Sequence, residues 1–188
     1  MTESARIVAL EPPYPADTGA MLAKWMPPGS AVEPLSLFRT LAIHQDLFSR
    51  MRPLGAGILG SRVVDGALRE VMIHRTCALC RCEYEWGVHS VSFGAAVGLT
   101  DEQLASTVHG GPDDGCWDPR QRAVLRLADE LHHTALVSDD LFRDLSLLFD
   151  TAQILELTVT AGWYHTIAFA VGVMGLAPEA WAARFPEA

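Results

Sequence analysis

The sequence predicts an all-helical protein with one main domain. Apolar residues recur at helical spacing along most of the chain, and the boundaries between these segments hold residues that begin or end helices. With 188 residues, 49% of them hydrophobic, the chain is long enough to bury a core. The formal net charge of −9 argues against nucleic acid as a partner, because binding to it depends largely on Lys and Arg at the phosphates.

The N-terminal part is expected to contain an arm followed by helices. Residues 1–34 form the arm, which contains Pro12, Pro13 and Pro15 and then a short helix over about 17–26. Apolar spacing predicts two helices, or one bent helix, over 34–55, with a break near His44. The next connection is expected to be flexible because of its glycines, Gly55, Gly57 and Gly60. Ser61 or Asp65 then begins the following helix.

The second half carries clear helix-start signals. They are a capping box at Thr100–Gln103, an N-cap followed by proline at Asp118–Pro119, and a serine cap at Ser138. The last long helix is expected over about 151–172, in a stretch whose one charged residue is Glu156. We expect a buried helix there and no membrane span, because its polar side chains would need partners in lipid. A helix apolar nearly all round also predicts a subunit interface and hence a homo-oligomer.

The expected functional centre runs from Glu70 to Gly98 and holds two helix-length segments. In the first segment, Glu70, His74 and Cys77 are spaced i, i+4, i+7, which places them on one face. In the second, another thiol, carboxylate and imidazole share a face at i, i+3, i+7: Cys82, Glu85 and His89. An antiparallel pairing of the two segments would turn both rows into one pocket.

These residues resemble the carboxymuconolactone decarboxylase family, which includes the alkylhydroperoxidase D-like (AhpD-like) proteins. The resemblance lies in Cys82-Glu-Tyr84-Glu85-Trp86-Gly-Val-His89, with Glu70 twelve positions before Cys82. The later run Gln153-Ile-Leu-Glu156-Leu, with Gly162-Trp-Tyr164, is similar to the closing helix of that family. The likeness spans about 35–175, so we expect a family-like domain over 35–177 and a C-terminal turn over 178–188. It implies an AhpD-like helical bundle with a central antiparallel helix pair, assembled as trimers or hexamers.

At one position, where Glu85 stands in place of a second cysteine, the chain resembles the decarboxylase branch of the family more closely than the peroxidase branch. The resemblance to it implies a lyase that removes carbon dioxide from a small lactone or carbonyl acid, with no cofactor. His89 would carry the proton, because its ordinary pKa of ~6.5 lies near neutral pH. Glu85 would orient His89, and Glu70 would be the second acid or base. Tyr84 and Trp86 are candidate pocket residues, and three arginines are candidates for binding a substrate carboxylate: Arg52, Arg75 and Arg81.

The peroxidase branch remains as an alternative. The resemblance implies a Cys-x-x-Cys at the start of the second helix, but Glu85 stands where the second cysteine would be. A carboxylate cannot resolve the intermediate that an attacking thiolate forms. However, Cys77-Ala-Leu-Cys80 is a displaced Cys-x-x-Cys, so Cys77, Cys80 and Cys82 could support thiol-dependent hydroperoxide reduction. A non-catalytic protein that binds a small molecule is the third possibility.

The other cysteines and histidines carry weaker expectations. Cys77, Cys80, Cys82 and His89 could supply four zinc ligands by type, but Cys80 and Cys82 diverge on a helix, so no metal is expected. His109, His132, His133 and His165 are expected to be surface or packing residues, and Trp163 and Tyr164 core or interface aromatics. The N-terminus lacks the pattern of a secretory signal, and three clustered cysteines suit a reducing compartment, so a cytoplasmic location is expected.

Overall fold

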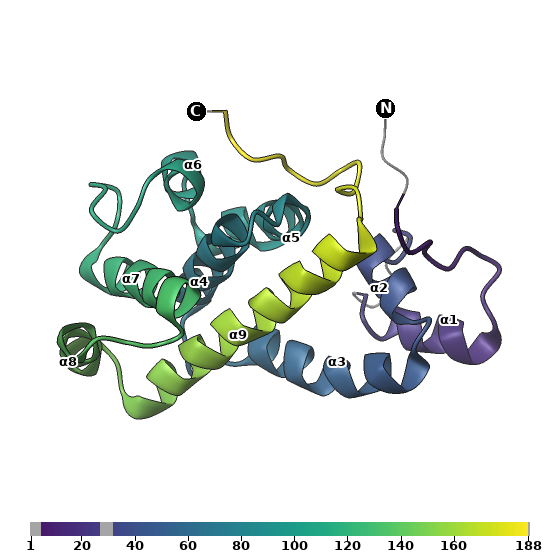
Figure 1. The fold of residues 1–188 in the computed structure, drawn as a ribbon, viewed down its shortest axis with the longest axis horizontal. Coiled ribbons are helices and arrows are strands. Elements are labelled where there is room, and N and C mark those ends of the chain that lie inside the picture. Colours follow the sequence, from purple (N-terminus) through teal and green to yellow (C-terminus); the bar gives the residue numbers. More distant parts are fainter. Residues whose placement is uncertain (1–4, 27–31, 188) are drawn as a thin grey trace.

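The computed structural model describes residues 5–26 and 32–187, and all regular structure in them is helical (Figure 1). This confirms the fold class predicted from the sequence. The α-helices are α1 (Ala16–Ala23), α2 (Ser36–Leu41), α3 (Gln45–Gly60), α4 (Gly66–Leu79), α5 (Glu83–His89), α6 (Asp101–His109), α7 (Pro119–Thr134), α8 (Asp139–Leu148) and α9 (Thr151–Met174). A π-helical turn, Ser90–Gly94, and a 3-10 turn, Ala95–Val97, extend α5.

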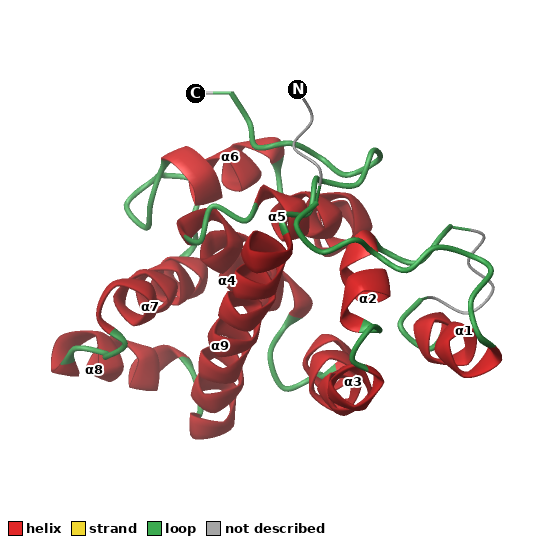
Figure 2. Cartoon of the chain, turned by 45° about the vertical axis from the view of Figure 1, so that its right-hand side comes forward, coloured by secondary structure: helices red, strands yellow, loops and turns green. Residues whose placement is uncertain are grey.

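Helix α9 crosses the molecule between two groups of helices. Figures 1 and 2 show α4 to α8 on one side of it and α1 to α3 on the other. Its first half packs with α4, α7 and α8 in one apolar cluster, through Leu157 and Ala161. Its second half, which includes Trp163 and Ile167, belongs to a second cluster with α2, α3 and α5. This double packing accounts for the apolar residues on the buried faces of α9.

By length and composition, α9 is the one helix among the described residues that could cross a membrane. Half of its apolar window is buried inside the structure. Contacts with both helix groups account for that burial, as expected of a core helix in a helical domain.

Local capping chemistry sets the helix boundaries as the sequence predicts. Thr100 and Asp118 both form complete capping boxes, and Ser138 accepts a hydrogen bond from the backbone of α8. Asp65, not Ser61, is the N-cap of α4 and accepts from the Ala67 amide. These bonds satisfy amides that have no partner within their own helix.

The prediction of a flexible connection at Gly55, Gly57 and Gly60 is wrong. Helix α3 continues to Gly60 and includes Pro53 in its interior. A Cβ atom on Gly55 would lie 2.9 Å from the ring of Trp163. The absence of a side chain at Gly55 therefore allows α3 to approach α9 closely, which propensity alone does not reveal.

Both terminal segments pack against the helical domain. The Arg6 amide donates to the Met174 carbonyl over 2.8 Å, at the end of α9. In the C-terminal segment, Glu179 accepts from the Ser36 amide over 2.6 Å, and the Ala183 amide donates to the Gly87 carbonyl. Residues 27–31 of the predicted arm lie outside the described residues.

Candidate active site

A tight turn ends α4 and positions the start of α5. The Arg81 amide donates to the Ala78 carbonyl, and the Cys82 amide donates to the Cys77 carbonyl over 2.8 Å. This pair of bonds is a Schellman motif, which usually has glycine at its left-handed position. Here Arg81 occupies that position with φ 54°. The turn reverses the chain and makes Cys82 the N-cap of α5.

The reversal brings the start of α4 to the end of α5, as an antiparallel pairing requires. His89 Nδ1 donates to Glu70 Oε2 over 2.8 Å, and both side chains are buried. His74, one helical turn after Glu70, bonds the Glu70 carbonyl through Nδ1 and the Ser90 hydroxyl through Nε2. The structure thus joins the two predicted rows through Glu70 and His89.

The two buried histidines have opposite pKa shifts. Burial lowers the pKa of His74 to about 4, so its ring is neutral near pH 7. Burial acts in the same direction on His89, but the charge and hydrogen bond of Glu70, together with Glu85, raise its pKa to about 9. His89 is therefore an imidazolium at neutral pH.

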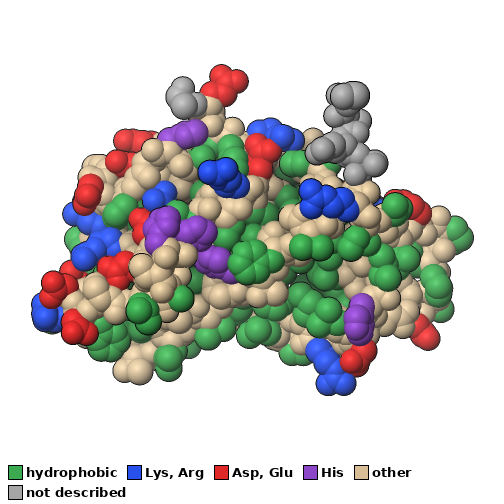
Figure 3. Space-filling model, in the orientation of Figure 1, with side chains coloured by type: hydrophobic (Ala, Val, Ile, Leu, Met, Phe, Trp, Pro, Cys, Tyr) green, Lys and Arg blue, Asp and Glu red, His purple; other side chains and the backbone are tan. Residues whose placement is uncertain are grey.

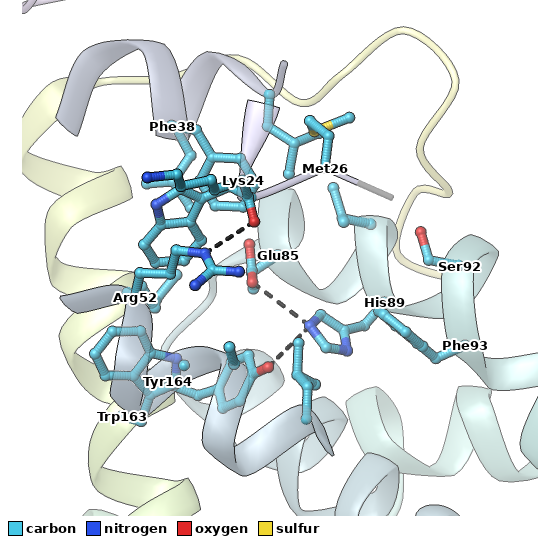
Figure 4. A pocket seen from close by; sticks show the side chains of 18 of the residues that line it. Lys24, Met26, Phe38, Arg52, Glu85, His89, Ser92, Phe93, Trp163 and Tyr164 are labelled. Carbon is cyan, nitrogen blue, oxygen red and sulfur yellow. Dashed lines mark hydrogen bonds and ion pairs between the residues drawn. The ribbon is translucent and has the colours of Figure 1, made fainter. Parts of the chain in front are cut away.

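A cavity of about 680 Å³ opens beside this pair, between α3, α5 and α9. Most of its wall is apolar, from residues such as Leu37, Phe38 and Ile167. The deeper polar groups are Glu85, His89 and Tyr164, which point toward one another in Figure 4. A mostly apolar cavity with a few converging polar groups is typical of a small-molecule site.

These three polar side chains form a connected set. His89 Nε2 lies 3.0 Å from the Tyr164 hydroxyl and 3.5 Å from Glu85 Oε1. Because the imidazolium donates from Nε2, the Tyr164 oxygen can accept, which leaves the hydroxyl proton free for a ligand. Within the described part of the chain, Glu85 Oε2 is buried without a hydrogen-bond partner. That oxygen is therefore available to accept a proton or a hydrogen bond from a molecule in the cavity.

The two carboxylates, Glu70 and Glu85, lie at different depths beside the cavity. Glu70 is fully buried behind His89 and does not line the cavity, whereas Glu85 does. Glu70 therefore orients His89 and favours its charged form, and Glu85 is the carboxylate that faces the cavity.

The two aromatic residues expected in the pocket lie elsewhere. The Tyr84 hydroxyl donates to Glu179 over 2.5 Å and accepts from the Leu37 amide. Trp86 Nε1 donates to Thr107 Oγ1, and its ring packs edge-on to Phe185. Both side chains attach α5 to neighbouring segments and contribute no wall to the cavity.

The thiols of this region are free and poorly ionised. Burial raises the pKa of Cys82 to about 12 and that of Cys77 well above its ordinary range. Burial also raises the pKa of Cys80, which is partly exposed. A protonated thiol is a poor nucleophile, so in this conformation none of these three is activated.

Of the three candidate arginines, only Arg52 lines the cavity. Its Nε donates to the Lys24 carbonyl over 2.9 Å, as drawn in Figure 4. Arg75 forms a two-bond ion pair with Asp129 on α7. Arg81 lies in the α4–α5 turn. Arg52 is thus the arginine that can meet an anionic group in the cavity.

Several solved structures share this arrangement of helices. An uncharacterized peroxidase-related protein from Silicibacter sp. TM1040 matches with a TM-score of 0.79 at 16% identity, over 99% of this chain and 100% of that one. The debrominase Bmp8 in complex with 2,3,4-tribromopyrrole matches with a TM-score of 0.77 at 11% identity, over 96% and 95%. A protein of unknown function from Agrobacterium tumefaciens, described in connection with AhpD and antioxidant defence, matches with a TM-score of 0.67 at 17% identity, over 74% and 95%.

Neither a protein-family model nor a curated protein sequence matches the chain. At these identities the structural likeness defines the fold. The chain has the AhpD-like fold, and the resemblance drawn from its residues is confirmed at that level.

Sequence reasoning missed the contribution of Tyr164 to this site. It was expected to be a core or interface aromatic, and it is buried, but its hydroxyl meets His89. A signal was present, because a buried tyrosine hydroxyl requires a hydrogen-bond partner.

Proposed function

We propose that the protein is an enzyme that uses general acid–base chemistry, without a cofactor, on a small carbonyl or lactone acid. The observation that supports this most directly is the set of Glu85, His89 and Tyr164 at the wall of a mostly apolar cavity. The AhpD-like neighbours support enzymatic activity in general, since one of them is a debrominase. They do not identify the reaction.

The proposed reaction is loss of carbon dioxide. The substrate carboxylate approaches Arg52, and its carbonyl oxygen accepts a hydrogen bond from Tyr164. Cleavage of the carbon–carbon bond releases carbon dioxide and leaves the electron pair as an enolate. The positive charge of His89 stabilises this enolate, and His89 delivers a proton from Nε2 to its carbon. Solvent then returns a proton to His89, and Glu85 can relay it.

The test compares a histidine variant with a matched control. His89→Gln is expected to lower turnover by ~10²-fold or more, because it removes both the proton and the charge. His133→Gln, at an exposed histidine on α7, should leave turnover unchanged. The assay measures release of carbon dioxide from a panel of lactone and β-keto acids. Equal turnover in the His89 variant and the control would remove His89 from the mechanism.

A second candidate is thiol-dependent reduction of a small apolar substrate such as an organic hydroperoxide. The observation in its favour is that Cys82 stands at the N-terminus of α5, one turn before Glu85. It would require a rearrangement that exposes the thiol, since burial holds the pKa of Cys82 at about 12. If the protein reduces hydroperoxides, Cys82→Ser should abolish peroxide consumption. If it is a decarboxylase, the same change should leave decarboxylation intact.

We also propose that the protein forms a homo-oligomer through α9. An exposed stripe along this helix combines apolar and small residues at alternating spacings of four and three: Leu155, Val159, Gly162, Thr166, Phe169 and Val173. That spacing is the pattern of helices that pack against one another. Light scattering coupled to gel filtration measures the mass, and a monomer at micromolar concentration would contradict this proposal.

A further inference from the structure

A second group of chemically active side chains lies outside the cavity, where three helices meet. Cys80 follows the last residue of α4, His132 lies in the last turn of α7, and His165 lies in the middle of α9. His132 Nδ1 is 3.0 Å from His165 Nε2 and 3.9 Å from Cys80 Sγ. The three atoms all lie within 4.8 Å of one another. In Figure 3, histidine side chains gather at the surface near α4 and α7.

The type and spacing of these atoms suit a transition metal. Zinc is held by thiolate sulfur at ~2.3 Å and imidazole nitrogen at ~2.0–2.1 Å in a tetrahedron, so neighbouring ligand atoms lie about 3.3–3.6 Å apart. The observed 3.0 and 3.9 Å lie on either side of that range. The third pair, Cys80 Sγ and His165 Nε2, lies within 4.8 Å, so the side chains must draw together around the ion to form the tetrahedron.

The contacts around Cys80, His132 and His165 are compatible with metal binding. His165 Nδ1 donates to the Ala161 carbonyl over 2.8 Å, which fixes the tautomer that keeps a lone pair on Nε2. Asp129, one turn before His132, is paired with Arg75 and does not join the group. All three side chains of the group are partly exposed, so an ion can enter from solvent.

We propose that Cys80, His132 and His165 form a binding site for one zinc ion, with the fourth position open to water. The site is separate from the cavity, because Tyr164 and His165 are neighbours on α9 and face different sides of it. The site also differs from the cysteine-rich set considered from the sequence. Bound zinc connects the α4–α5 turn to α7 and α9, and it withdraws Cys80 from thiol chemistry.

The test is calorimetric titration of the reduced, metal-free full-length protein with zinc chloride. The wild type should bind one equivalent, and Cys116→Ser, a change at a cysteine outside the group, should bind as tightly. Cys80→Ser, His132→Gln and His165→Gln should each weaken binding by at least about 10-fold, since outer-shell changes alone cost 10–100-fold. Binding should also raise the midpoint of thermal unfolding of the wild type.

Cobalt supplies a measurement that does not depend on the variants folding well. Cobalt bound at this site should show thiolate-to-cobalt charge-transfer absorption in the wild type, and zinc should displace it. In Cys116→Ser, a change at a cysteine outside the group, that absorption should remain. No zinc uptake by the wild type, or the same affinity in Cys80→Ser as in wild type, would overturn the proposal.

Discussion

Replacing Glu70 by glutamine tests whether this carboxylate keeps His89 charged. Glutamine retains the size of Glu70 and an oxygen that can accept from His89 Nδ1, but it has no charge. Burial alone would lower the pKa of His89, and Glu70 and Glu85 raise it to about 9. In Glu70→Gln, the pKa of His89 should therefore fall by more than ~1 unit, toward or below its ordinary value of ~6.5.

The raised pKa of His89 also makes the free energy of unfolding depend on pH. The pKa of His89 is raised in the folded state, so its stabilising contribution is complete below about pH 6.5 and is lost as the pH rises through about 9. Because each pKa unit corresponds to 1.36 kcal/mol, the rise from ~6.5 to about 9 is worth about 3 kcal/mol. The free energy of unfolding of Glu70→Gln should decline less across this window than that of the wild type.

Two measurements check the expectation. Urea unfolding followed by circular dichroism, between about pH 6 and pH 10, gives the free energy of unfolding of the wild type and of Glu70→Gln. The contributions of other titrating groups cancel in the difference between the two proteins. NMR titration of the His89 ring gives its pKa directly. Glu102→Gln, an exposed change in the first turn of α6, is the matched control and should follow the wild type. A pKa of His89 that stays near 9 in Glu70→Gln would refute the electrostatic argument.

Two backbone predictions concern the surroundings of the site. A Cβ on Gly87 would lie 2.0 Å from the carbonyl oxygen of Ala183, so Gly87→Ala should destabilise the protein by ~1–3 kcal/mol in urea unfolding and expose the C-terminal segment to proteolysis. Gly57→Ala is the contrast, with no atom within 4 Å, and should stabilise α3 by up to ~1 kcal/mol. Equal effects of the two changes would contradict the packing argument. Arg81→Gly should stabilise by ~1–2 kcal/mol, because Arg81 has a left-handed backbone; a loss of stability would show that its side chain matters more.

Local chemistry determined much of the helical framework. The caps at Thr100, Asp118 and Ser138 act on amides two or three residues away, so the sequence was sufficient to place those helix starts. The i, i+4 and i, i+7 spacings likewise put Glu70 and His89 on faces that could meet. The glycines of α3 show the limit of this reasoning, since Gly55 is explained by Trp163 far along the chain.

Only the tertiary structure decided which polar groups face the cavity and which lie behind it. Glu70 and Glu85 are equivalent candidates by type and spacing, yet packing buries the first and opens the second to the cavity. The pairing of Tyr164 with His89 spans 75 residues, and that of Cys80 with His132 spans 52. Such contacts depend on how α9 packs between the other helices, and no short-range pattern in the sequence encodes them.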